Sequence, residues 1–123
     1  MANLIPTLTL TSTNATSDEL NFSVTDDLGV GNNIVSLSKI SCGTSAANEI
    51  LSAAAHASIG QELYLYIKNM DGTNYVEVKT AAGVAFARLR AEEFMFLPLK
   101  DGVGFEVQAN TAACVIEYGY WGL

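Results

Sequence analysis

Apolar and polar residues alternate with a period of two along most of the chain. Successive side chains of a β-strand point to opposite faces of a sheet, so each alternating segment is predicted to be a strand with one buried face. The clearest segments are residues 7–13, 20–25, 63–68, 75–79, 103–109 and 114–120. With the shorter apolar segments between them, the pattern predicts eight to ten short strands.

Residues that favour turns separate these strands. Residues 26–33 are rich in Asp, Gly and Asn and are predicted to form a loop. Asp71-Gly72 is a pair that tight β-hairpins prefer, and Ala82-Gly83 and Asp101-Gly102 separate further strands. Pro98 cannot donate a hydrogen bond to a neighbouring strand, so its segment is expected at a sheet edge or at a strand end.

Residues 48–57 leave two interpretations open. Asn48 resembles a helix N-cap, and the alanines that follow favour a helix. A helix of about ten residues is marginal by itself, however, and the flanking segments are strands. A strand followed by a loop is slightly favoured here over a helix.

The close spacing of the strands predicts an all-β fold. Connections this short leave no room for the crossover helices that parallel strands need, so the sheets are expected to be antiparallel. We predict a single β-sandwich domain over residues 1–123, of jelly-roll or related Greek-key type, with at most one short helix.

The charge of the chain excludes two classes of partner. Of its 123 residues, 13 are acidic and 6 are basic, and none of the basic residues precedes Lys39. Nucleic acids and anionic membranes are bound through clustered cations, but Arg88 and Arg90 are the only close pair. We therefore expect neither nucleic acid nor a membrane as a partner. The N-terminus also lacks the basic and long apolar regions of a signal peptide, so synthesis in a cytoplasm is expected.

No set of residues assembles a recognisable catalytic or metal site. A nucleophile–histidine arrangement would have to use His56, the only histidine, with Ser52 four residues before it. Neighbouring carboxylates such as Glu92-Glu93 point to opposite faces of a strand. Cys42 and Cys114 are too far apart in the sequence for a zinc motif and are expected to be free, buried thiols. We predict no enzyme, no catalytic residues, no cofactor and no metal.

Aromatic residues near the C-terminus are candidates for an interface, because Tyr and Trp are enriched where proteins bind one another. Packing on a second sheet face and stacking against sugars remain alternative interpretations. The N-terminal strand, residues 4–13, is uncharged and alternates regularly, so it could add to a sheet of a neighbouring chain. The candidate interface residues are Leu8, Leu10, Tyr64, Tyr66, Tyr75, Tyr118, Tyr120 and Trp121.

Four segments resemble small β-sandwich virion proteins of tailed bacteriophages. They are a strand ending in Asn (residues 62–69), a segment with Asn-Tyr-Val (73–78), a strand beginning with Glu-Phe (93–99) and a closing strand (115–119). The resemblance covers about residues 60–120.

The resemblance implies a structural virion component without catalytic residues or cofactors. The first expectation is a capsid decoration, or cement, protein located in the virion, which binds the major capsid protein or other virion proteins. A tail, neck or fibre component, or a carbohydrate-binding module, is the alternative. Such proteins are similar in forming homo-oligomers, often trimers.

Overall fold

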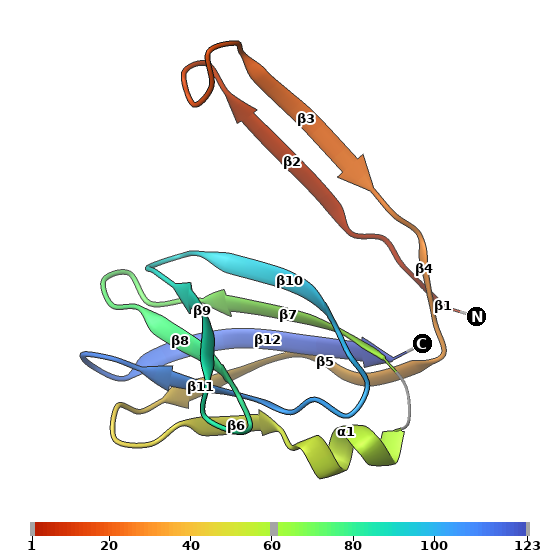
Figure 1. Ribbon diagram of the computed structural model, residues 1–123, viewed down its shortest axis with the longest axis vertical. Coiled ribbons are helices and arrows are strands. Elements are labelled where there is room, and N and C mark those ends of the chain that lie inside the picture. Colours follow the sequence, from red (N-terminus) through yellow and green to blue (C-terminus); the bar gives the residue numbers. More distant parts are fainter. Residues whose placement is uncertain (1, 60–61, 123) are drawn as a thin grey trace. The chain divides into compact units, whose positions relative to one another are not determined.

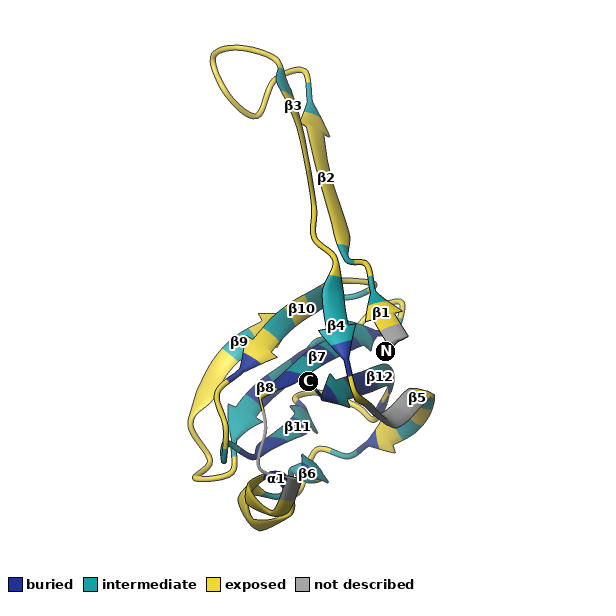
Figure 2. Cartoon of the chain, turned by 90° about the vertical axis from the view of Figure 1, so that its right-hand side faces the viewer, coloured by how far each residue is buried: buried dark blue, intermediate teal, exposed yellow. Residues whose placement is uncertain are grey.

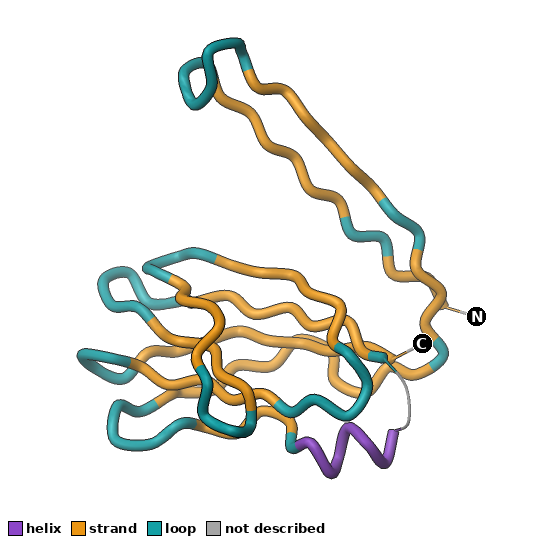
Figure 3. Tube along the Cα trace, viewed as in Figure 1, coloured by secondary structure: helices purple, strands orange, loops and turns teal. Residues whose placement is uncertain are grey.

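The computed structural model describes residues 2–59 and 62–122. Contacts within the chain divide it into two compact units, Met1–Gly31 and Asn32–Leu123. The first is a two-stranded ribbon, which we call the hairpin unit, and the second is the sandwich unit (Figures 1 and 3). The sandwich that was predicted over residues 1–123 is thus built by the second unit, and the two units are described separately.

The hairpin unit consists of four short strands that pair two by two. β1 (Ala2–Leu4) pairs antiparallel with β4 (Leu28–Val30), and β2 (Thr7–Ser12) pairs antiparallel with β3 (Leu20–Thr25). Between the two pairs, the N–H of Asp26 donates to the carbonyl of Pro6 at 3.1 Å. The loop predicted over residues 26–33 is therefore wrong for 28–30 and 32–33, because pairing keeps both stretches extended.

Within its described residues, 32–59 and 62–122, the sandwich unit contains eight strands and one short helix. Its elements are β5 (Asn32–Cys42), β6 (Asn48–Leu51), α1 (Ala53–Ile59), β7 (Leu63–Asn69), β8 (Val76–Thr80), β9 (Ala85–Leu89), β10 (Phe94–Leu99), β11 (Phe105–Ala109) and β12 (Cys114–Gly122).

The eight strands form two antiparallel sheets of four. We call the sheet with strand order β10-β7-β12-β5 sheet I, and the sheet with order β6-β11-β8-β9 sheet II. Four strand pairs are nested in the sequence: β5 with β12, β6 with β11, β7 with β10 and β8 with β9. This order is that of a jelly roll, which confirms the predicted all-β antiparallel sandwich. Pro98 lies on β10, an edge strand, as predicted.

The core of the sandwich unit lies between the two sheets, and alternate residues of each central strand point into it. The ring of Tyr120 packs edge-on against that of Phe105, with the ring centroids 6.4 Å apart. Residues with no exposed surface in this core are Cys42, Leu63, Leu65, Ile67, Val76, Val78, Phe105, Val107, Cys114 and Ile116.

The ambiguous residues 48–57 divide between strand and helix. The strand β6 ends at Leu51, and α1 begins at Ala53 because the hydroxyl of Ser52 accepts a hydrogen bond from the N–H of Ala55 at 3.0 Å. The expected strand followed by a loop is thus right for 48–51 and wrong for 53–57. The residue that caps the helix is Ser52 and not Asn48.

Asp71-Gly72 does not form the predicted hairpin, since β7 and β8 belong to different sheets. The carboxylate of Asp71 instead accepts the N–H groups of Thr73 and Asn74, at 2.9 and 2.6 Å, which lowers its pKa. The predicted turn at Ala82-Gly83 does join a hairpin, β8 to β9, where Gly83 has a φ of 86°.

Candidate interaction surfaces

One face of the hairpin unit is apolar and exposed. The register pairs Leu8 with Val24 and Leu10 with Phe22, so these four side chains lie on the same face. Their exposed fractions are 42%, 50%, 45% and 43%, in that order. Figure 2 shows β2 and β3 exposed along almost their whole length. We call these four residues, with the half-buried Leu20 beyond them, the hairpin apolar face.

The opposite face of the same hairpin is polar. Thr7 pairs with Thr25 and Thr9 with Ser23, and their hydroxyl groups lie 3.1 and 3.2 Å apart, within hydrogen-bond distance. These cross-strand contacts hold the two strands in register and leave the polar face able to meet water. The hairpin is therefore amphipathic, like a strand pair at the surface of a larger sheet.

A two-stranded hairpin alone is marginally stable in water, because it needs further strands or another layer on its apolar side. Covering a fully exposed Leu, Val or Phe side chain contributes about 1.5–3 kcal/mol. The four exposed residues are about half exposed, so covering them is worth on the order of 3–6 kcal/mol. This gain makes the hairpin apolar face a candidate site for another protein surface.

The outer face of sheet I carries a second group of large side chains. Leu63, Leu65 and Ile67 of β7 point into the core, so Tyr64 and Tyr66 point outward. Trp121 of β12 is the register partner of Tyr64 and lies on the same face. On β10, Phe94 and Phe96 are 60% and 38% exposed. The outer aromatic face is defined here as Tyr64, Tyr66, Phe94, Phe96 and Trp121.

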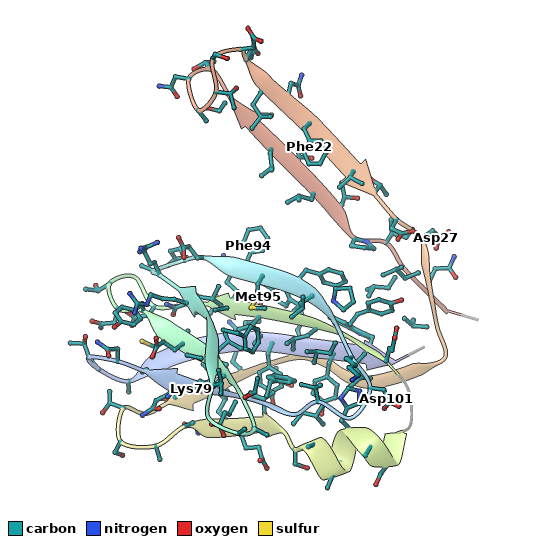
Figure 4. All side chains as sticks on the ribbon, in the orientation of Figure 1. Phe22, Asp27, Lys79, Phe94, Met95 and Asp101 are labelled. Atoms are coloured by element: carbon teal, nitrogen blue, oxygen red, sulfur yellow. The ribbon has the colours of Figure 1, made fainter. Side chains whose placement is uncertain are left out.

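Contacts within the outer aromatic face order its rings. The rings of Tyr64 and Phe96 are stacked, with centroids 6.2 Å apart and planes 8° from parallel. The hydroxyl of Tyr66 donates to the carboxylate of Glu117 at 3.1 Å. Burial, followed by this hydrogen bond, raises the pKa of Tyr66, so the phenol stays protonated at neutral pH. In Figure 4 the Phe94 side chain leaves β10 on the side opposite to that of Met95, which contacts the core.

The outer face of sheet II is different, because it is charged. Arg88 lies 3.5 Å from the carboxylate of Glu77, and its guanidinium stands 4.3 Å from the centroid of the Tyr75 ring. The Lys79 ammonium, labelled in Figure 4, donates to the side-chain carbonyl of Gln108 at 2.6 Å. These groups satisfy one another within the chain, so this face has less need of a partner than the outer aromatic face.

The structure separates the eight candidate interface residues into four places. Leu8 and Leu10 belong to the hairpin apolar face. Tyr64, Tyr66 and Trp121 belong to the outer aromatic face. Tyr75 lies beside Arg88 near the start of β8. Tyr118 and Tyr120 pack against the core, where Tyr120 is 8% exposed, so they do not lie on the surface with Trp121.

Several residues of these surfaces were not among the interface residues predicted from the sequence. Phe22 and Val24 follow from the alternation in residues 20–25 once this strand is paired with β2. Phe94 and Phe96 alternate with Met95 and Leu97, which pack against the core. Alternation could also have separated Trp121 from Tyr118 and Tyr120, which share the parity of Cys114 in β12.

His56 and Ser52 act in the local structure of α1. His56 is fully buried, and its Nδ1 lies 2.6 Å from the carbonyl oxygen of Val103, which accepts the hydrogen bond. The Ser52 hydroxyl caps the helix. Gly104 follows Val103, and a Cβ at this position would lie 2.5 Å from the backbone nitrogen of Ala53. These contacts fix α1 against the connection between β10 and β11.

Cys42 and Cys114 are register partners on β5 and β12 and are free thiols, as expected. Burial, and secondarily the nearby Cys114, raises the pKa of Cys42 to about 11. Burial also raises the pKa of Cys114. Both thiols are therefore protonated and unreactive at neutral pH.

Residues 2–59 and 62–122 contain no group of three or more His, Cys, Asp or Glu side chains that could hold a metal ion. Within the same ranges, no helix is long and apolar enough to cross a membrane.

Comparisons with models of protein families, with curated proteins and with solved structures find no match to this chain.

Proposed function

We propose that this protein is a structural component of a tailed-phage particle, and specifically a decoration protein that binds the assembled head. The observation that carries the proposal is the hairpin apolar face, which no other part of the hairpin unit covers. An assembly subunit would cover it against another protein. Residues 60–120 resemble small virion proteins, which also supports a role as an assembly subunit. The resemblance further indicates that the assembly is a phage particle.

The mechanism of such a protein is physical. Subunits that lie across the junctions between capsid proteins add buried apolar area at those junctions, and they raise the force needed to separate them. The two apolar surfaces described above would contribute to these contacts, either directly against the capsid protein or by joining neighbouring subunits that lie across the junction. The acidic chain, with its single close pair of cations, suits the outside of a head better than a surface against DNA.

Carbohydrate binding is the second candidate function, and the outer aromatic face is the reason to consider it. Rings such as Tyr64 and Trp121 can stack on sugars. A sugar also needs polar groups around the rings for its hydroxyls, whereas the β10 side of this face consists of the apolar Phe94, Phe96 and Pro98. These apolar neighbours favour a protein partner.

The proposal is tested with the phage that carries the gene. Heads made without this protein are purified, and the purified chain is added back in a sedimentation assay. We expect saturable binding in a fixed ratio to the major capsid protein, and a higher temperature of DNA release. Purified chain that stays in the supernatant, with unchanged release of DNA, contradicts the proposal. Binding to tails alone would place the protein there instead.

Two variants test whether the hairpin apolar face takes part in head binding. Leu10→Ser puts a polar group into this face and is expected to weaken head binding about tenfold or more. Thr9→Ser changes the neighbouring residue on the polar face and keeps its hydroxyl, so it should bind like the unchanged chain. Equal binding of both variants would show that the apolar face takes no part.

A further inference from the structure

We infer that the hairpin apolar face of one copy of this protein packs on the outer aromatic face of a second copy, so that copies assemble by exchanging hairpins. The inference rests on the proposed function as an assembly subunit and names the partner of that surface. Each face is exposed in its own unit: Phe22 and Val24 are 43% and 50% exposed, and Phe94 is 60% exposed. One type of contact between copies would cover both.

The two faces match in strand length. The hairpin has two six-residue strands, and β10 and β7 have six and seven residues, with Phe94, Phe96, Tyr64 and Tyr66 pointing away from the core. Two β-surfaces pack face to face when the side chains between them are apolar, which is the arrangement inside a β-sandwich. The hairpin would thus form a third layer on sheet I of its neighbour.

The distribution of charge favours this contact over one between two hairpins. Residues 1–31 contain Asp18, Glu19, Asp26 and Asp27 and no Lys or Arg, while all six basic residues lie in the sandwich unit. Two hairpins face to face would bring eight acidic groups together without a cation. Like charges across an interface are unfavourable, so hairpins should avoid one another.

By the same criterion of charge, an acidic hairpin packs more favourably on the outer aromatic face than on another hairpin. Lys68 projects from it beside the ring of its register partner Phe94, and Lys39 lies on the same face of β5. Their charges are matched by Glu117 between them and by Glu92, which lies 3.9 Å from Lys68. This face is therefore neutral overall.

The outer face of sheet II has no such balance. It carries the carboxylates of Glu49, Glu77 and Glu106 against the cations Lys79 and Arg88. An acidic hairpin would meet an excess of negative charge there, and of the large apolar side chains of β9 only Phe86 is exposed, at 45%. The outer face of sheet I is thus the surface of the sandwich unit on which an acidic hairpin is expected to pack.

The area that a stable interface needs indicates a closed assembly. A specific interface buries roughly 800 Å² on each partner. Two six-residue strands, each about 20 Å long and about 5 Å apart, present a face of only a few hundred Å². When every copy both gives its hairpin and receives one, each chain contributes two surfaces to the assembly. Such a head-to-tail contact closes into a dimer or a ring when the rotation between copies allows it.

Disulfide trapping between two differently tagged chains tests the inference. Leu10→Cys in one chain is mixed with Phe94→Cys, and separately with Phe96→Cys, in the other, and the mixture is oxidised. Cys42 and Cys114 are fully buried and stay in place. We expect a cross-linked band that contains both tags. The control, Thr9→Cys on the polar face of the same hairpin, should give little of it.

Sedimentation velocity over a range of concentrations gives the second measurement. The unchanged chain should form a discrete oligomer, and Leu10→Ser or Phe94→Ser should each weaken association about tenfold or more. A monomer at every concentration overturns the inference. So does an oligomer in which Leu10→Cys links only to itself, or to neither position on β10.

The outcomes also separate this inference from the proposed function. A chain that remains monomeric but restores purified heads is a decoration protein without hairpin exchange. A chain that exchanges hairpins but does not bind heads, tails or other parts of the particle assembles by itself, and the virion role is then wrong.

Discussion

The strands β2 and β7 have the same pattern and different surroundings. Both alternate apolar and polar residues, and both pair with antiparallel neighbours. Leu65 and Ile67 of β7 have no exposed surface, because β7 is flanked by two strands and faces sheet II. Leu8 and Leu10 of β2 are 42% and 45% exposed, because only β3 accompanies them. Alternation therefore shows which side chains share a face and does not show what covers it.

The largest expected difference between the two units concerns one phenylalanine in each. Phe105→Ala removes a fully buried ring from the core and should lower the free energy of unfolding by about 3–5 kcal/mol. Phe22→Ala removes a ring that is already 43% exposed, and should lower it by less than about 1 kcal/mol in the dilute chain. Urea unfolding followed by the fluorescence of Trp121, the only tryptophan, reports on the sandwich unit.

If Phe22→Ala lowers the stability of the sandwich unit as much as Phe105→Ala does, the two units do not unfold independently. If Phe22→Ala acts only at high concentration, its ring is covered in an oligomer. The comparison of dilute and concentrated samples therefore decides between these two results.

A second difference between the two units concerns the hydrogen bonds of their polar side chains. The buried amide of Asn69 donates to the carbonyls of Asn74, Leu89 and Arg90, at 2.8, 3.1 and 3.1 Å, and its oxygen accepts the N–H of Asp71. Asn69→Ala removes these four hydrogen bonds from a buried site and should cost about 2–4 kcal/mol.

The matched change in the hairpin unit is Thr9→Ala, which removes the exposed hydroxyl pair with Ser23. Its expected cost is below about 0.5 kcal/mol, because water replaces the lost contact. Both variants are measured by urea unfolding. An Asn69→Ala chain as stable as Thr9→Ala would mean that water satisfies the groups around Asn69.

Alkaline pH should affect the sandwich unit through Cys42. In the unfolded chain a thiol ionises at about pH 8.5, whereas in the folded chain the pKa of Cys42 is about 11. The unfolded state thus loses its proton first, and the free energy of unfolding falls as the pH rises between these values. Urea unfolding at a series of pH values measures this fall, and Cys42→Ala should make it shallower. An unchanged slope in Cys42→Ala would assign the fall to other groups, among them Tyr66 and Tyr120.

The smallest expected effect is a gain in the stability of the sandwich unit. Glu92 has a φ of 67°, a left-handed conformation that glycine adopts more readily than glutamate. Glu92→Gly should raise the stability of the sandwich unit by about 0.5–1 kcal/mol, since the exposed ion pair that it removes with Lys68 is worth little. Thermal unfolding measures the gain, and Ala91→Gly in the same turn should lower stability instead. The hairpin unit offers no matching site, because no described residue in it has a positive φ.

Much of the sandwich unit could be predicted from the sequence because its pattern is local. Leu63, Leu65 and Ile67 alternate with Tyr64 and Tyr66, and the strand, its buried face and its outer face all follow from these few residues. The positions of turns at Gly83 and Gly102 follow from the backbone freedom of glycine, and both residues have a positive φ. Pro98 fixed the place of β10 at an edge because the missing N–H forbids a neighbour on that side.

The remaining features depend on contacts between distant residues. Nothing near Asp71-Gly72 shows that the chain passes from one sheet to the other there. The start of α1 at Ala53 depends on Ser52, which was considered as a nucleophile and not as a helix cap. Leu28–Val30 becomes a strand only because Ala2–Leu4 lies beside it. The hairpin apolar face could be drawn from alternation, but its exposure follows from the absence of a third strand.

The pairing of β5 with β12 has a consequence for the order in which the two units fold during synthesis. Asn32 and Gly122 are register partners, so the first strand of the sandwich unit pairs with the last one to leave the ribosome. Contacts between residues this far apart in sequence slow folding, since a long loop must close first. The hairpin unit closes over only a short turn and needs no later residue. During synthesis all residues of the hairpin apolar face are therefore present and able to pair while the sandwich still waits for its final strand.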